Sequence, residues 1–350
     1  MHRAAEERAR FMAGLPVAAR HHNHIQLISQ LTLEDSDRAD LERRGVPDGV
    51  IDTFVSVKPW QILRTAVDAK TPGVGGNGSK LNTKYSGYLV PALDLDAQIQ
   101  GWQIRNRVVA DDAPKYIWAS THSNPVNLQN GELPLTFCRG SESPQGKAIY
   151  FSEGLLKPLV TSFRHDISLI GAAGGLFSSS PKQLEGWLKQ LSPSELILCP
   201  DAGAVSNTDV MRAYSRLNTL LVELGHTLQV LWWGQDTKSA DDIDEIAPEL
   251  FAKAEVISWA EFAAKNCSQT IVKADKSKPV LKPNRKKKGA ITSVKKLDEK
   301  AQQKQNWLED MAKVAGHYPR VYQQCFHGSA AATAGTCRRH LSGPSPCKAW

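Results

Sequence analysis

The sequence predicts an α/β fold in which helices flank a mainly parallel sheet, with a smaller α+β part before it. From Lys147 onwards, apolar runs of strand length alternate with stretches of helical periodicity, which is typical of parallel sheets. Upstream, residues 85–107 carry β-type apolar residues interrupted by Gly101, which indicates short strands. The 41% of hydrophobic and 23% of charged residues are typical of a globular protein.

We expect the chain to divide into four parts. They are a helical N-terminal region at 1–70, a strand-rich subdomain at 71–144, an α/β domain at 145–265, and a basic linker with a disordered, truncated or frameshifted tail at 266–350. Within the second part, the segment GVGGNGSK superficially resembles a phosphate-binding GxxxxGK[ST] loop. Its last two residues, Ser79 and Lys80, stand in reversed order and no apolar strand precedes it, so we expect a flexible loop instead.

The α/β region can be followed element by element. Its longest helix has Asn207 or Thr208 as N-cap, places apolar residues at three- and four-residue spacing, and ends at Gly225. Another helix begins at Pro181, because proline is favoured in the first turn. Strands are expected at 148–152, 167–170, 195–199 and 227–233, and a short helix from Leu155.

Acidic residues follow three of these strands. Glu153, Asp201 and the run 241–245 fall at expected carboxyl ends of strands, where parallel sheets bind their ligands. A single acidic residue there is more often a helix cap or a solvated charge, but three in one sheet favour a site. Converging carboxylates can hold Mg²⁺ with waters and phosphates, and one can act as a general acid or base. The candidate metal ligands are Glu153, Asp201, Asp241, Asp242 and Asp244.

The charge distribution permits a nucleic-acid partner. The net charge is +7, and lysines and arginines gather between Lys273 and Lys288 among prolines. We expect this segment to be solvated, either attached to phosphates or serving only as a tether. Six widely spaced cysteines, the lack of a signal-peptide pattern and the absence of a long apolar stretch predict a cytoplasmic protein without a membrane partner.

Several phrases resemble a known domain family. FSEGLLKPL looks like the Glu-Gly turn that opens a Toprim domain, LILCPDAGAVSN resembles its Asp-x-Asp loop, and KSADDIDEI is similar to its final acidic motif. Upstream, YLVPALDLDAQIQGWQIRNR and APKYIWAS resemble the stretch that precedes Toprim in bacterial replicative primases. Over about residues 25–265 the chain is most similar to the Toprim-like domain of cyanobacterial plasmid replication proteins, with WWGQDTKSADDIDEI and PDAGAVSN as the most specific phrases.

The resemblance implies a Toprim-type sheet after a primase-like subdomain, and Mg²⁺- or Mn²⁺-dependent nucleotidyl transfer on single-stranded DNA. Glu153 would be the catalytic acid/base or a metal ligand, and Asp201 a catalytic metal ligand. It also implies a replicative helicase partner, in cis or in trans, although no P-loop helicase module is visible. The implied nucleotide- and DNA-binding residues are Arg105, Arg107, Lys115 and Lys157. The alternative is surface charge on a strand for the first three, above all for Arg107, and a solvated helix face for Lys157.

The sequence departs from the primase pattern at one position. Gly203 stands where a primase-like loop carries its second carboxylate, so metal affinity should fall unless a carboxylate of the 241–245 run compensates. Restoring the carboxylate as Gly203→Asp should strengthen Mg²⁺ binding if the loop accepts a side chain. Three functions therefore stay open: a primase-like nucleotidyltransferase, a non-catalytic DNA-binding or assembly module, and a Toprim nuclease.

Overall fold

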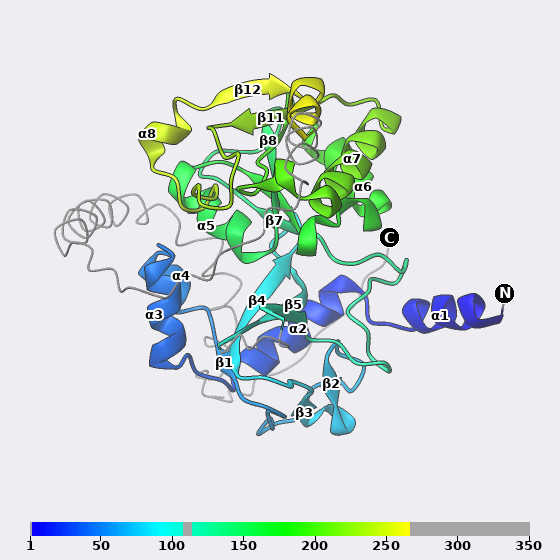
Figure 1. Ribbon diagram of the computed structural model, residues 1–350. Coiled ribbons are helices and arrows are strands. Elements are labelled where there is room, and N and C mark those ends of the chain that lie inside the picture. The colour runs from blue at the N-terminus through cyan, green and yellow to red at the C-terminus, as the bar shows by residue number, and fades with distance from the viewer. Residues whose placement is uncertain (1, 108–113, 267–350) are drawn as a thin grey trace, which may run out of the picture.

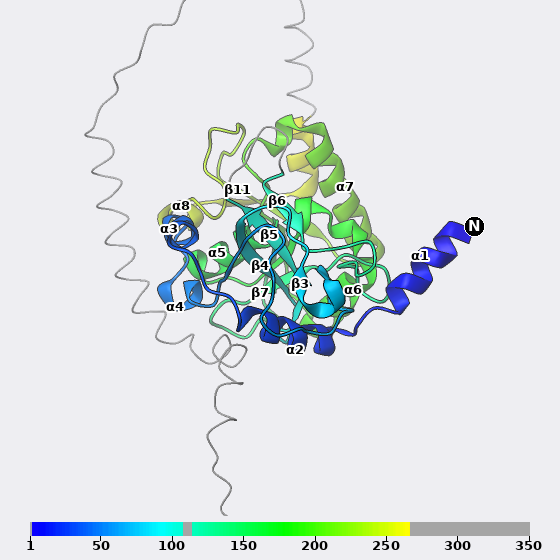
Figure 2. The ribbon, with the colours of Figure 1, turned by 90° about the horizontal axis from the view of Figure 1, so that it is seen from below.

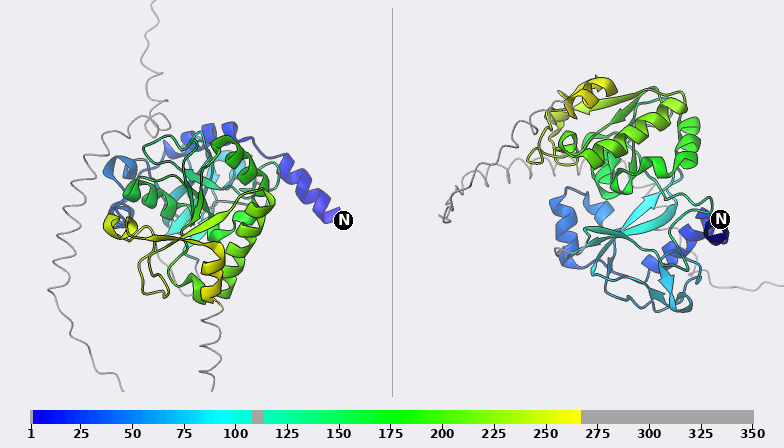
Figure 3. Two further views of the ribbon diagram at one scale, coloured as in Figure 1. Left: turned by 90° about the horizontal axis from the view of Figure 1, so that it is seen from above. Right: turned by 45° about the vertical axis from the view of Figure 1, so that its right-hand side comes forward.

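A computed structural model describes residues 2–107 and 114–266 of the chain, and Figure 1 shows their arrangement. The basic segment 273–288 and the predicted tail lie outside the described residues. Two parts are stacked on each other: a six-stranded sheet with its helices, and an N-terminal part built on an antiparallel sheet (Figures 1 and 3). Within the described part, no helix is long and apolar enough to cross a membrane.

The six-stranded sheet confirms the predicted fold class. Its order is β12-β11-β10-β8-β9-β7, in which the four central strands run parallel and the strands at both edges pair antiparallel. Leu198 of β10 lies opposite Phe151 of β8 on one side and Val230 of β11 on the other, so apolar residues form continuous rows across the sheet. The strands are β7 (Thr136–Cys138), β8 (Ile149–Glu153), β9 (Leu169–Ala172), β10 (Leu196–Leu198), β11 (Leu228–Trp232) and β12 (Glu255–Ser258).

Helices cover both faces of this sheet. Helices α6 (Pro181–Leu191) and α7 (Thr208–Glu223) share one apolar core with the strands, in which Phe151 packs edge-on against Phe177. Helices α5 (Leu156–His165) and α8 (Pro248–Phe251) lie on the opposite face. Successive residues of a strand point to opposite faces of the sheet. In β10, Leu196 and Leu198 belong to the core on one face and Ile197 to the apolar cluster on the other, so the strand is apolar throughout.

The strand order creates a topological switch point. The strand that follows β8 in the chain, β9, lies on one side of it, whereas the next one, β10, lies on the other side. The chain therefore leaves the carboxyl ends of β8 and β10 in opposite directions. In parallel sheets, ligands typically bind at the carboxyl ends of two such strands. Glu153 is the last residue of β8, and Asp201 lies in the loop after β10.

The N-terminal part combines helices with a four-stranded antiparallel sheet of order β1-β4-β5-β6. Helix α2 lies along this sheet, while α1 projects away from the body of the molecule (Figure 2). The elements are α1 (His2–Met12), α2 (Val17–Ile28), α3 (Asp35–Arg43), α4 (Asp48–Ile51), β1 (Ser56–Val57), β2 (Val74–Gly75), β3 (Lys80–Leu81), β4 (Gly87–Leu93), β5 (Ile99–Asn106) and β6 (Tyr116–Trp118).

The glycine-rich segment is not the flexible loop that its composition predicted. Strands β2 and β3 pair across a 3₁₀ turn at Gly76–Gly78. At Gly78, where φ is +92°, a Cβ atom would lie 1.9 Å from the Val67 carbonyl oxygen, so only glycine fits this close approach. The glycines therefore permit backbone packing here, and the segment does not open a helix as a P-loop does.

The two parts are joined by shared packing. Val50, Ile51 and Tyr88 of the N-terminal part belong to one apolar cluster with Leu159 and Phe163 of α5. Strand pairing also crosses the predicted borders at 70 and 144, since β1 pairs with β4 and β7 pairs with β9. The domain boundaries themselves stay predictions. This packing holds the antiparallel sheet beside the first turns of α5, next to the switch point.

Arg20 provides a test of how α2 is anchored. Its side chain, 1% exposed, donates hydrogen bonds to the backbone carbonyls of Leu15, Gln100, Val126 and Asn127. Arg20→Met leaves these acceptors without their charged donor, so the free energy of unfolding should fall by about 3 kcal/mol in urea denaturation.

Arg212→Met is the matched control, because that arginine is exposed on α7 and pairs only with a neighbouring aspartate. It should change the unfolding free energy by less than about 0.5 kcal/mol. Equal effects of the two substitutions would contradict the anchoring role of Arg20.

Candidate functional site

The acidic strand ends converge on a lysine. Lys157 lies in the first turn of α5, directly after the Glu153-Gly154 turn, where Gly154 has a φ of +87°. Its Nζ atom donates to Asp201 Oδ1 at 2.6 Å and to Asp242 Oδ2 at 2.8 Å. The Lys157 side chain is only 16% exposed, so it does not lie on a solvated helix face. These contacts form an ion triad of Lys157, Asp201 and Asp242.

Backbone contacts hold the two aspartate loops together. The second oxygen of Asp242, Oδ1, accepts a hydrogen bond from the Ala202 N–H at 2.8 Å. The Asp201 N–H donates to the hydroxyl oxygen of Tyr214, a fully buried residue of α7, at 3.3 Å. The loop after β10 is therefore held by hydrogen bonds to α7 and to the loop after β11.

Glu153 and Asp244 border the triad. Burial raises the pKa of the Glu153 carboxyl to about 7, and the neighbouring Asp201 adds to the rise while Lys157 opposes it. Burial also raises the pKa of Asp244, again opposed by Lys157, and Asp244 Oδ1 has no hydrogen-bond partner. Burial acts to lower the pKa of the Lys157 ammonium, but Asp201 and Asp242 outweigh it, so the net pKa lies above its usual value.

The side chains as they stand do not fit a divalent ion. Across residues 2–107 and 114–266, no three His, Cys, Asp or Glu residues form a group that could hold a metal. An ammonium group, already bonded to both carboxylates, lies between Asp201 and Asp242. Asp241 is exposed, and its carbonyl oxygen accepts a hydrogen bond from Trp233 Nε1. The metal-ligand roles of Glu153, Asp201, Asp241, Asp242 and Asp244 stay predictions.

Gly203 cannot take a side chain without rearrangement. Its φ is +74°, and a Cβ atom would lie 2.7 Å from the backbone nitrogen of Lys238. Its N–H donates to the Gln235 carbonyl oxygen at 3.0 Å, which presses the loop after β10 against the loop after β11. Gly203→Asp was expected to strengthen Mg²⁺ binding only if the loop accepts a side chain. The loop does not accept one, because the backbone at Lys238 occupies the space that the side chain would need.

A basic cluster lies beside the acidic edge. Arg105 and Lys115 flank the ring of Tyr116, with Arg105 Cζ 5.4 Å and Lys115 Nζ 5.9 Å from its centroid. Arg44, at the end of α3, bonds Asp40 Oδ2 at 3.1 Å, and Arg105 Nε lies 3.9 Å from the same oxygen. We call Arg44, Arg105 and Lys115 the basic cluster.

Arg164 of α5 connects this cluster to the acidic run, since it donates to the backbone carbonyl oxygens of Arg44 at 3.4 Å and of Glu245 at 3.2 Å. Burial lowers the pKa of the Lys115 ammonium, and the charges of Arg105, Arg44 and Lys157 lower it further, while Asp244 opposes the shift. Arg105 and Lys115 share the ring of Tyr116, whereas Lys157 belongs to the ion triad. The nucleic-acid-binding roles of all three residues stay predictions.

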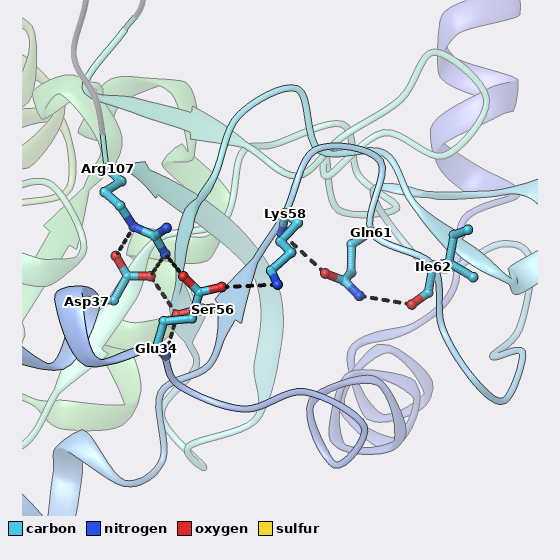
Figure 4. A network of polar contacts seen from close by, with 7 residues as sticks. All are labelled: Glu34, Asp37, Ser56, Lys58, Gln61, Ile62 and Arg107. Atoms are coloured by element: carbon cyan, nitrogen blue, oxygen red, sulfur yellow. Dashed lines mark hydrogen bonds and ion pairs between the residues drawn. The ribbon is translucent and has the colours of Figure 1, made fainter.

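Arg107 points into a separate network of polar contacts, shown in Figure 4. Its guanidinium group donates to both oxygens of Asp37, at 3.0 and 2.7 Å, and pairs with Glu34 at 2.8 Å. Asp37 is buried and also accepts a hydrogen bond from the Ser56 hydroxyl. These contacts favour a structural role, in which Arg107 ties the start of α3 to the sheet; its predicted contact with nucleic acid remains untested.

Sequence reasoning missed two residues of this region. Tyr214 belongs to the apolar face predicted for α7, but its hydroxyl group reaches the Asp201 backbone. A hydroxyl at a buried helix position was the available signal. Arg44 is one of two adjacent arginines before Gly45, and no local pattern indicates which of them turns toward the sheet.

The comparisons with known proteins found no matching family model and no matching curated protein. Solved structures do match. A DnaG primase catalytic domain bound to single-stranded DNA is 15% identical, with a TM-score of 0.47, and the match covers 73% of this chain and 84% of that one. The RNA polymerase domain of Mycobacterium tuberculosis primase DnaG, bound to a double-stranded DNA oligomer with an overhang, is 13% identical, with a TM-score of 0.44, and the match covers 86% and 97%. The Escherichia coli primase catalytic core is 16% identical, with a TM-score of 0.42 over 71% and 80% of the two chains.

The close approach at Gly203 predicts a loss of stability. Gly203→Ala and Gly203→Asp should each lower the free energy of unfolding by about 3 kcal/mol, because positive φ and the contact with Lys238 both oppose a side chain. Gly225→Ala is the matched control, since Gly225 has a φ of +82° and open space around its Cβ position. That substitution should cost only about 1–2 kcal/mol. Equal losses at the two glycines would show that the contact is unimportant.

The raised pKa of Glu153 predicts a pH-dependent stability. In the folded protein the pKa of Glu153 is about 7, so the carboxyl group keeps its proton up to about that pH. In the unfolded chain its pKa is about 4.3, and the proton is released there. The stabilising contribution is therefore complete below the unfolded pKa and is lost as the pH rises through 7. Glu153→Gln cannot ionise, so at pH 8 it should be more stable than the wild type by about 1–3 kcal/mol.

The measurement is urea unfolding of both proteins in EDTA at pH 4.5 and pH 8. The difference between variant and wild type should grow with pH. A constant difference, or a variant that is less stable at pH 8, would show that Glu153 ionises normally in the folded protein.

Proposed function

We propose that this chain is a primase-like module of a DNA replication protein of a plasmid or another mobile element, and that it binds single-stranded DNA and nucleotides. The observation that carries the proposal is that Arg164 of α5 joins the basic cluster to the acidic run after the switch point, because it donates to the backbone carbonyl oxygens of Arg44 and Glu245. The motifs that resemble replicative primases and plasmid replication proteins fall on these same elements. A helicase partner stays a prediction.

The chemistry of the basic cluster suits a single strand. Guanidinium and ammonium groups pair with phosphate oxygens, and the ring of Tyr116 holds Arg105 and Lys115 close together. Cations grouped in this way can follow the phosphates of a flexible single strand, which supports a single-stranded partner.

Binding without catalysis is the function that the geometry supports best. The resemblance implies Mg²⁺- or Mn²⁺-dependent nucleotidyl transfer, but the carboxylates hold Lys157 and do not fit the ion as they stand. Nucleotidyl transfer is the second candidate, favoured by Glu153, because a carboxyl group with a pKa of about 7 can exchange a proton near neutral pH.

One assay separates these candidates. Purified protein is incubated with single-stranded DNA, labelled nucleotides and Mg²⁺ or Mn²⁺, beside a Glu153→Gln variant. Extended product that disappears in the variant, with DNA binding retained, supports nucleotidyl transfer. Shortened DNA indicates the Toprim nuclease, which uses the same type of site. Bound but unchanged DNA supports the binding module.

DNA affinity itself should depend on Lys115. Lys115→Gln removes one phosphate-neutralising charge, so the affinity for a labelled single strand should fall about 5- to 10-fold, and the slope of log K against log salt should decrease by about 0.7. Fluorescence anisotropy at several salt concentrations measures both quantities.

Lys189→Gln is the matched control, because Lys189 is exposed on α6 and pairs with Glu185 away from the basic cluster. Its affinity and salt slope should equal those of the wild type. If the two variants bind alike, the basic cluster does not contact DNA and the proposed function loses its main support.

A further inference from the structure

We propose that Lys157 is a built-in cation that takes the place of a divalent metal ion between Asp201 and Asp242. Its ammonium group contacts one oxygen of each carboxylate, at 2.6 and 2.8 Å. An ammonium group is a compact charge with three donors, so it can join two carboxylates from different loops as a bound ion would. The inference concerns metal binding alone and does not depend on DNA binding.

The place of Lys157 in the fold keeps its ammonium group beside the two carboxylates. It lies in the first turn of α5, which is packed against β8 and β9 and shares an apolar cluster with the N-terminal part. The Lys157 side chain is 16% exposed, and those of Asp201 and Asp242 are 27% and 30% exposed. A bound metal ion can dissociate into solvent. The ammonium group cannot, because it is covalently attached to α5.

Entry of a divalent ion is opposed for two reasons. The ion would have to displace the ammonium, which would then be a largely buried charge without its partners. If the ammonium stayed, the two cations would repel each other across a short distance. The site is therefore expected to discriminate against Mg²⁺ and Mn²⁺ although its oxygen ligands suit them.

The surrounding backbone supports the same conclusion independently. Asp242 Oδ1 is already occupied by the Ala202 N–H. At Gly203, the backbone nitrogen of Lys238 lies 2.7 Å from the position of a Cβ atom, so the loop has no room for another ligand. The loops after β10 and β11 are thus held together by Lys157 and by backbone contacts. A metal ion bound by both loops would hold them together in the same way.

The test uses the full chain and Mn²⁺ alone, without DNA. Thermal unfolding of the wild type should be unchanged by Mn²⁺, and its Mn²⁺ electron paramagnetic resonance signal should remain that of the free ion. Lys157→Met leaves the carboxylates facing each other, so this variant should lose stability in EDTA and regain it with Mn²⁺. At about 100 times the dissociation constant, Mn²⁺ should raise its Tm by about 5 °C or more.

Lys189→Met is the control and should behave as the wild type in both conditions, because Lys189 pairs with Glu185 on the exposed side of α6. A wild-type Tm that rises with Mn²⁺, and no longer rises in Asp242→Asn, would overturn the proposal without recourse to Lys157 variants. A Lys157→Met protein that neither binds nor is rescued by Mn²⁺, including one that fails to fold in its presence, would also overturn it.

Discussion

The ion triad of Lys157, Asp201 and Asp242 determines the geometry of the acidic edge. Removing charged groups from water is unfavourable, and each of these three is tolerated in a partly buried place only because the others are within hydrogen-bonding distance. The triad joins α5, the loop after β10 and the loop after β11, which come from separate stretches of the chain. Its members therefore act as one unit, and Glu153 and Asp244 border it.

The stacking of the two parts gives this edge its electrostatic setting. The apolar cluster between α3, α4, β4 and α5 holds the antiparallel sheet against α5, the helix that carries Lys157. Arg44 of the N-terminal part and the carboxylates of the sheet therefore both contact residues of α5. The Arg107 network contributes indirectly, because it fixes the start of α3 and with it the approach of Arg44.

Local patterns predicted much of the fold. The alternation of strands and helices after Lys147 is present, and Asn207 caps α7 by accepting hydrogen bonds from the Asp209 and Val210 N–H groups. These features depend on residues close in sequence, so their propensities are visible there. The hairpin at Val74–Leu81 was missed because Gly78 is required by its contact with Val67, which lies outside the hairpin.

The sequence by itself determined the fold class and placed Glu153, Asp201 and the 241–245 run at strand ends, since strand and helix periods are local. Only the tertiary structure decided what these carboxylates face. Lys157 follows Glu153 by four residues, but its partners lie 44 and 85 residues further along the chain, and parallel strand pairing brings them together. Likewise, the closed space at Gly203 depends on the backbone of Lys238, because two loops approach each other there. Electrostatic and steric contacts between distant segments carry no local signature, and this is why the acidic motifs suggested a metal site while the folded chain places an ammonium between the carboxylates.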